Sequence, residues 1–183
     1  MMDTSQMELI PLLETLNHKE YDLVELDTSV LEEVKMLTIR TMHSYKSQGR
    51  TFQRKRSNVF FGKLAEYAFK QKFGDAVTDV YTGNTYDEGY DFIFKNSGKK
   101  IDVKFFGYDT YHSMVSVSYT ATKSDYYAAF RKIYIGVDKA VLDFYGFYDI
   151  KEYLKNDKSK GTHYLFQNFF YIPCSKFKNI EIC

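Results

Sequence analysis

Asp91, Asp102 and Lys104 are residues whose types and spacing could perform chemistry. Side chains alternate across a strand, so Asp102 and Lys104 share one face of the run that holds them. A turn centred near Ser97 would bring Asp91 about opposite Asp102, where the Cβ atoms of an antiparallel pair are roughly 4.5–5.5 Å apart. Two carboxylates so close repel and need a compensating cation, and oxygen ligands suit Mg²⁺ or Mn²⁺. Lys104 could then position or activate water, or stabilise charge on a phosphate.

Two short β-rich runs must hold these side chains. Residues 91–94 and 101–105 are rich in Phe, Ile and Val, and they are separated by Asn96-Ser97-Gly98, which has the composition of a turn. This pattern predicts a β-hairpin.

A third carboxylate, Glu66, lies on a helix that is expected to begin at Ser57 or Asn58 and to end near Gly74. Glu66 belongs to a helical row of otherwise apolar or small residues, where a carboxylate is out of character. It is either a metal-site or water-orienting group, or an exposed Glu paired with Lys63 or Lys70, which the spacing permits. The apolar stripe of this helix is Phe61, Leu64, Ala65 and Ala68.

The order of helix acid, hairpin and following strand resembles the PD-(D/E)XK nuclease superfamily, which has the restriction-endonuclease-like fold. Asp91 matches the first acid of the motif, Asp102-Val103-Lys104 matches the D-x-K element, and Glu66 matches a further acid on the preceding helix. Tyr90 stands where the name of the motif has Pro, a position that varies in the family. The resemblance covers about residues 58–137.

This resemblance implies an α/β fold with a central mixed sheet of four or five strands flanked by helices. It implies a Mg²⁺- or Mn²⁺-dependent nuclease, a hydrolase of phosphodiester bonds that is most often a DNA endonuclease. Asp91, Asp102 and Glu66 would bind the metal, and Lys104 would serve the nucleophile or the developing charge. DNA is expected over RNA, and a homodimer is possible.

Basic residues just before the predicted catalytic helix suggest a contact with nucleic acid. They are either a solvated connector or a phosphate-contacting arm, since Lys and Arg supply the sequence-independent part of nucleic-acid affinity. A later helix is expected from Lys123 to about Phe130, capped by Thr122 or Ser124, and in the resembled family a polar residue there sometimes helps the site. The residues expected to bind nucleic acid are Arg50, Arg54, Lys55, Arg56 and Lys123.

Strands and a further helix are expected elsewhere. A helix beginning near Thr28 or Ser29 should run to about Ser47. The predicted strands are residues 21–26, 114–119, 132–137, 140–148 and 166–172. We expect residues 1–57 to be an N-terminal helical extension packed on a nuclease-like core of residues 58–183, with both in one globular unit.

Composition limits the protein's class and setting. The chain has 183 residues, 44% of them hydrophobic, which predicts one domain with a full core. A net charge of +1 excludes wholesale attraction to nucleic acid, so any binding surface must be local. Two cysteines cannot form a disulfide framework, and neither a secretory signal nor a membrane span is expected, so a cytoplasmic location is predicted.

Two alternatives to catalysis stay open. The same fold could be a catalytically silent binding or inhibitory protein that acts through nucleic-acid or protein contacts. Asp102 and Lys104 could also simply pair along one strand face as a packing feature. Metal dependence separates these readings, because carboxylates that cluster without a metal cost stability.

Overall fold

The computed structural model describes eight segments of the chain, which are residues 21–44, 52–80, 89–106, 114–118, 123–151, 164–166, 169–173 and 176–180. The described elements, in chain order, are β1 (Leu23–Leu26), α3 (Thr28–Ser44), α4 (Phe52–Phe73), the short 3₁₀ helix η1 (Gly74–Ala76), β2 (Val77–Asp79), β3 (Phe92–Phe94), β4 (Lys100–Phe106), β5 (Met114–Ser118), β6 (Tyr126–Ile135), β7 (Ala140–Asp149), β8 (Tyr164–Phe166) and β9 (Phe169–Pro173). Within these residues, no helix has the length and apolar character that crossing a bilayer requires.

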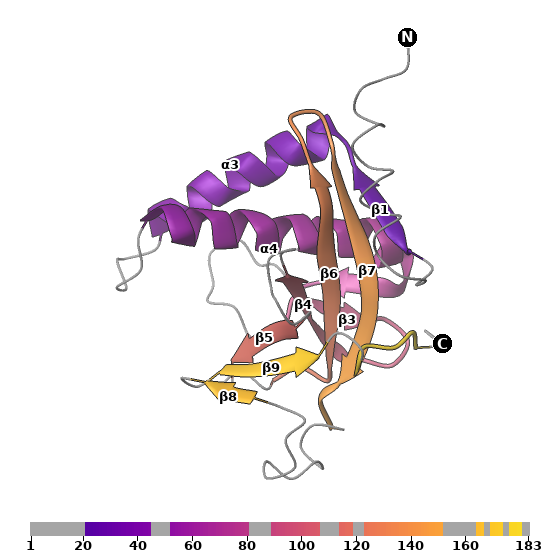
Figure 1. Cartoon of the computed structure of the whole chain (residues 1–183). Coiled ribbons are helices and arrows are strands. Elements are labelled where there is room, and N and C mark those ends of the chain that lie inside the picture. The colour runs from indigo at the N-terminus through magenta and orange to yellow at the C-terminus, as the bar shows by residue number, and fades with distance from the viewer. Residues whose placement is uncertain are drawn as a thin grey trace.

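Six strands form one mixed sheet in the order β1-β7-β6-β4-β3-β2 (Figure 1). β4 and β6 are parallel, and the other neighbouring strands are antiparallel. A second sheet has the order β5-β9-β8. The α/β class is confirmed, whereas the expected four or five strands are too few, because the short strands β1 and β2 extend the sheet at its two edges.

The helix expected from Lys123 to about Phe130 is wrong, because these residues lead into and form the first half of β6. The strand is buried on both faces. Ala128 and Phe130 pack in the core beside α4, and Tyr127 and Ala129 pack in the cluster on the opposite face. A short apolar run of this kind does not reveal its period in the sequence, and pairing with β4 and β7 decides it.

α4 crosses the sheet on one face, with α3 packed beside it (Figure 1). Its predicted stripe faces the core, since Leu64, Ala65 and Ala68 are fully buried and Phe61 packs partly buried against the same cluster. Phe69 is also fully buried, and its ring lies 4.9 Å from the ring of Phe92. Small alanines allow the helix to approach the strands closely, and the aromatic rings fill the remaining space.

The expected boundary between residues 57 and 58 falls inside α4, which begins at Phe52. Residues before this boundary also supply β1, which pairs with β7 at the edge of the six-stranded sheet. The N-terminal part of the chain therefore contributes a strand as well as a helix to the same sheet.

Asp27, rather than Thr28 or Ser29, caps α3. Its Oδ1 accepts hydrogen bonds from the backbone N–H of Val30 at 3.0 Å and from the Ser29 hydroxyl at 2.6 Å. A carboxylate at this position satisfies a backbone donor that the first turn leaves free. The buried side chains of the helix are Leu31, Val34, Thr38 and Met42.

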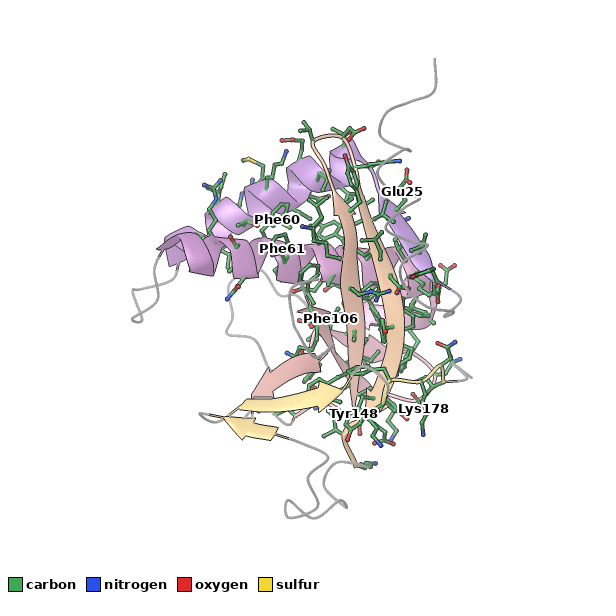
Figure 2. The ribbon with its side chains drawn as sticks, viewed as in Figure 1. Glu25, Phe60, Phe61, Phe106, Tyr148 and Lys178 are labelled. Carbon is green, nitrogen blue, oxygen red and sulfur yellow. The ribbon has the colours of Figure 1, made fainter. Side chains whose placement is uncertain are left out.

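The opposite face of the sheet is covered partly by the second sheet and by the C-terminal segment. Ile172 of β9 and Phe177 pack against Tyr148 and Phe106 in one buried cluster, and Figure 2 labels the latter two residues. Two backbone hydrogen bonds of 2.8 Å join Phe147 to Lys178. Helices thus cover one face of the sheet, and strands and the C-terminal segment contribute to the cover of the other.

Candidate functional site

The predicted hairpin is confirmed, with β3 and β4 as its strands. Phe92 pairs with Ile101 and Ile93 pairs with Lys100, and Asp102 lies close enough to Asp91 for its negative charge to raise the pKa of the Asp91 carboxyl. The amide N–H of Asp91 donates to the carbonyl of Ile101 at 2.8 Å, which holds Asp91 at the start of β3. The two motif acids are therefore brought together by the ladder, as the alternation of residue types predicts.

The Asp91 carboxylate bonds to the backbone of the facing strand. Its Oδ2 accepts a hydrogen bond of 2.7 Å from the backbone N–H of Val103, beyond the last pair of residues in the two strands. Burial raises the pKa of Asp91 well above its ordinary value, and the negative charges of Glu66 and Asp102 raise it further. The N–H of Val103 and the charge of Lys104 act in the opposite direction but do not cancel this effect.

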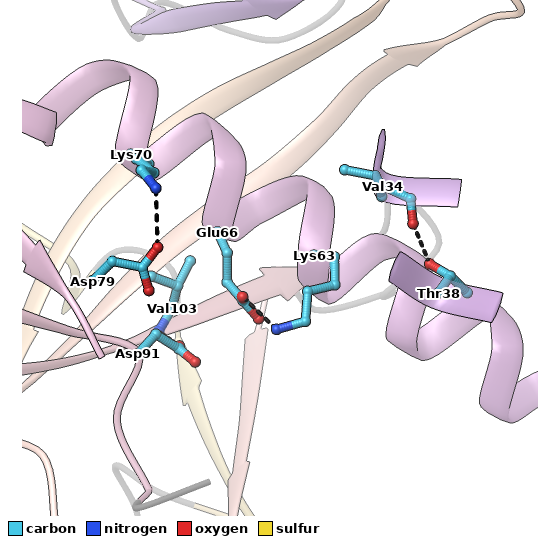
Figure 3. A network of polar contacts seen from close by, with 8 residues as sticks. All are labelled: Val34, Thr38, Lys63, Glu66, Lys70, Asp79, Asp91 and Val103. Carbon is cyan, nitrogen blue, oxygen red and sulfur yellow. Dashed lines mark hydrogen bonds and ion pairs between the residues drawn. The ribbon is translucent and has the colours of Figure 1, made fainter. Parts of the chain in front are cut away.

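Glu66 approaches Asp91 from α4 (Figure 3). Its Oε2 accepts a hydrogen bond of 2.6 Å from Lys63 Nζ, one helical turn earlier, and both side chains are partly buried. The sequence left Lys63 and Lys70 open as partners; Lys70 instead pairs with Asp79 at 3.0 Å. Glu66 thus takes part in an ion pair and also acts electrostatically on Asp91.

Asp102 is buried on β4, and its Oδ2 lies 2.6 Å from Lys104 Nζ on the same strand. The ammonium also lies 5.6 Å from the centre of the Tyr127 ring on the neighbouring strand β6. The pairing that the packing alternative requires is therefore present. This pairing does not explain Asp91, because the ion pairs of Lys63 and Lys104 among the described contacts are with Glu66 and Asp102.

Three elements thus contribute to one charged cluster, which consists of Glu66 from α4, Asp91 before β3, and Asp102 and Lys104 from β4, joined by Lys63. We call these five residues the carboxylate cluster. It contains three acids and two ammonium groups, so its ionised form carries one excess negative charge. Burial first, and then the charges of the other two acids, raise the pKa of Asp91.

The donor chemistry of the carboxylate cluster fits a hard divalent cation, because all its acidic ligands are oxygens. Among the described residues, however, no group of three or more His, Cys, Asp or Glu side chains already stands in an arrangement that could hold a metal ion. Glu66 and Asp102 are each turned to a lysine at 2.6 Å. Binding a cation through all three acids would therefore require these two side chains to exchange partners.

The structure describes only some of the residues expected to contact nucleic acid. Arg50 lies outside the described residues, and so do the side chains of Arg54 and Lys55 on α4. Arg56 is exposed on the same helix.

Lys123 is exposed and its stem runs along Gly89, two residues before Asp91. A Cβ added to Gly89 would lie 3.5 Å from the Lys123 Cβ. The next residue, Ser124, donates a hydrogen bond of 2.7 Å to the Gly89 carbonyl. Lys123 therefore lies beside the residues that lead into Asp91. It precedes β6 and is not on the helix that was expected here.

A second buried ion pair was not found by sequence reasoning. Arg131 Nη2 on β6 lies 2.7 Å from Oδ2 of the fully buried Asp143 on β7. The sequence does show Asp143 as a single carboxylate within the apolar run 140–148. It does not indicate that Arg131 is the partner.

No protein-family model, curated protein or solved structure matches this chain. The interpretation of the carboxylate cluster therefore rests on its residues and geometry.

Proposed function

We propose that this protein is a metal-dependent nuclease of the PD-(D/E)XK type that hydrolyses phosphodiester bonds, with DNA as the favoured substrate. The observation that carries the proposal is Asp91, a carboxylate with a raised pKa between two other carboxylates, at the junction of a hairpin and a helix. Perturbed acids gathered in this way are typical of functional sites. The mixed sheet with α4 across one face is compatible with a restriction-endonuclease-like core, although it has more strands than expected.

Each residue of the carboxylate cluster has a role in this proposal. Asp91 and Asp102 would hold Mg²⁺ or Mn²⁺, and Glu66 would assist as a third ligand or by orienting water. The bound cation supplies a Lewis acid for the phosphate and lowers the pKa of its water. The Lys104 side-chain nitrogen lies 2.6 Å from Asp102, where it can stabilise charge that develops on the phosphate.

The alternative is a catalytically silent binding or inhibitory protein with the same kind of fold. One observation favours it: Glu66 and Asp102 each already have a lysine partner at 2.6 Å. In that case the cluster would be a structural feature, and no cation would be needed to stabilise it.

Cleavage assays test the proposal. Purified protein is incubated with supercoiled DNA, linear DNA, single-stranded DNA and RNA in Mg²⁺, Mn²⁺ or EDTA, beside Asp102→Asn, Lys104→Ala and the control Lys70→Ala. We expect cation-dependent cutting that Asp102→Asn and Lys104→Ala each reduce about 100-fold or more, because groups that act on the developing charge contribute about this much. Lys70→Ala should cut like the wild type, since Lys70 pairs with the exposed Asp79.

A folded protein that cuts none of these substrates would contradict the proposal and favour the silent binding protein. Cutting that persists in Asp102→Asn would also contradict it, because the activity would then belong to another site or to a contaminant.

A further inference from the structure

A group of lysines lies beside the carboxylate cluster, where the start of β4 meets the start of β6 and the end of β7. Lys99 and Lys100 precede and begin β4, Lys123 precedes β6, and Lys151 follows β7. These ends of the strands are far apart in the sequence, so the sheet topology brings the lysines together.

Asp125 is the acid at the centre of this group. Its Oδ1 lies 3.7 Å from Lys99 Nζ and 4.0 Å from Lys151 Nζ, so both ammonium groups share one carboxylate oxygen. Its Oδ2 accepts a hydrogen bond of 3.0 Å from the backbone N–H of Lys100. Asp125 is therefore fully engaged and still cannot neutralise both lysines.

Backbone hydrogen bonds hold the ends of these strands together. The N–H of Asp125 donates to the Lys100 carbonyl at 2.8 Å, and the N–H of Ile150 donates to the Asp125 carbonyl at 3.0 Å. A second acid, Asp149, accepts a hydrogen bond of 2.7 Å from the N–H of Lys151. Counted over the described residues alone, two carboxylates, Asp125 and Asp149, stand against four lysines, which is an excess of two positive charges.

Solvent reaches the two lysines that pair with Asp125. The side chains of Lys99 and Lys151 are 36% and 60% exposed, whereas that of Asp125 is 27% exposed. The acid therefore lies deeper than the bases, and an anion arriving from solvent meets the ammonium groups first. In a protein whose net charge is +1, such a local excess is a specific feature of this surface.

The group also lies close to the carboxylate cluster. Lys100 and Asp102 are two residues apart on β4 and share a face, a separation of about 7 Å along a strand. Lys123 runs along Gly89, which precedes Asp91 by two residues. A chain of phosphates bound on the lysines would therefore pass beside Asp91 and Asp102.

We propose that Lys99 and Lys151, with Lys100 and Lys123 beside them, form a phosphate-binding surface that holds the nucleic-acid backbone next to the carboxylate cluster. This inference rests on the proposed function, because it deepens that function by naming where the substrate strand binds. Lysines on such a surface contact phosphates as point charges, and they contribute affinity without reading sequence.

Binding of a fluorescent DNA duplex and of a single strand, measured in EDTA at several salt concentrations, tests the proposal without any cleavage. Lys99→Gln/Lys151→Gln should weaken binding roughly tenfold at low salt. It should also reduce the slope of log affinity against log salt by about 1.8 for the duplex and about 1.4 for the single strand, since two phosphate contacts are lost. The matched control Lys35→Gln/Lys139→Gln removes two lysines that pair with Glu32 and Glu25, and it should bind like the wild type.

Asp125→Asn should change the DNA affinity in the opposite direction. The amide keeps an oxygen that can accept from the Lys100 N–H, but it no longer competes for the two ammonium groups. We expect tighter DNA binding in this variant, which a general loss of folding could not produce. Circular dichroism is used to check that each variant is folded.

Two results would overturn the proposal: wild-type protein that does not bind DNA in EDTA, or Lys99→Gln/Lys151→Gln with wild-type affinity and salt slope. Neither result decides the cleavage assay. A different combination is that the wild type cuts no substrate while Lys99→Gln/Lys151→Gln loses DNA binding. That combination would support the phosphate-binding surface and contradict the nuclease.

Discussion

Two groups of buried charges lie on the same sheet, and they differ in how well they are balanced. Asp143 is fully buried, and its carboxylate accepts from Arg131 at 2.7 Å and from the backbone N–H of Asp22 at 3.0 Å. The Arg131 guanidinium also lies 5.0 Å from the centre of the Tyr145 ring. One acid here has one base, with further contacts to both.

The carboxylate cluster has three acids and two bases, and Asp91 accepts its described hydrogen bond from a backbone N–H instead of from a base. A balanced pair between strands needs no ligand to explain it. An excess carboxylate at a helix and strand junction is a cost that a bound cation would remove. Burial and the excess acid together raise the pKa of Asp91, and the excess acid distinguishes the carboxylate cluster from the Arg131–Asp143 pair.

Removing one partner of the balanced pair should have the largest effect on stability. Asp143→Ala leaves the Arg131 charge buried and unpaired, so we expect the free energy of unfolding to fall by about 3–5 kcal/mol in urea titrations. Mg²⁺ should not restore it. The double variant Asp143→Leu/Arg131→Met should lose much less, because it removes both charges; an equally large loss would show that packing, not charge balance, dominates this pair.

Removing the excess acid of the carboxylate cluster should instead increase stability. In EDTA at pH 7, Asp91→Asn should raise the free energy of unfolding by on the order of 1 kcal/mol, whereas most substitutions lower it. The amide oxygen can still accept from the Val103 N–H, so the hydrogen bond need not be lost.

The pH dependence of the same variant sharpens this prediction. Below a pH near 3.8, Asp91 is protonated in both the folded and the unfolded wild type. Above it and up to the raised pKa of the folded state, only the unfolded state releases the proton, so wild-type stability falls as pH rises through this window and then levels off. Asp91→Asn should lack this loss, and identical pH profiles for the two proteins would contradict the account.

The smallest expected effect concerns Lys63. Its ammonium competes with a cation for Glu66, so Lys63→Met should bind Mn²⁺ roughly three- to tenfold more tightly in calorimetric titrations. Lys70→Met is the matched control, because Lys70 lies on the same helix but pairs with the exposed Asp79. Weaker Mn²⁺ binding by Lys63→Met than by the control would mean that Lys63 supports the site instead of competing for it.

Local patterns predicted the parts of the site that depend on nearby residues. The turn composition around Ser97 and the alternation in β4 were sufficient for the hairpin, and the spacing of Leu64, Ala65 and Ala68 was sufficient for the buried face of α4. Glu66 was identified because a carboxylate was unexpected in its helical row. These features require only the periods of a strand and a helix.

Contacts between distant segments could not be predicted in the same way. Helical spacing allowed both Lys63 and Lys70 as partners of Glu66, and the position of Asp79 next to Lys70 is a property of the folded sheet. β6 was mistaken for a helix at its start because its burial on both faces removes the alternation. Likewise, the meeting of Lys99 and Lys151 at Asp125 depends on strand order.

The most direct test of the carboxylate cluster as a metal site is a calorimetric titration of wild-type protein, Asp91→Asn, Asp102→Asn and Lys70→Met with Mn²⁺. We expect wild type and Lys70→Met to bind the cation alike, and each Asp→Asn variant to bind it at least about tenfold more weakly, since each loses one charged ligand. Absence of Mn²⁺ binding by folded wild type, or equal binding by all four proteins, would contradict the assignment of the carboxylate cluster as a metal site.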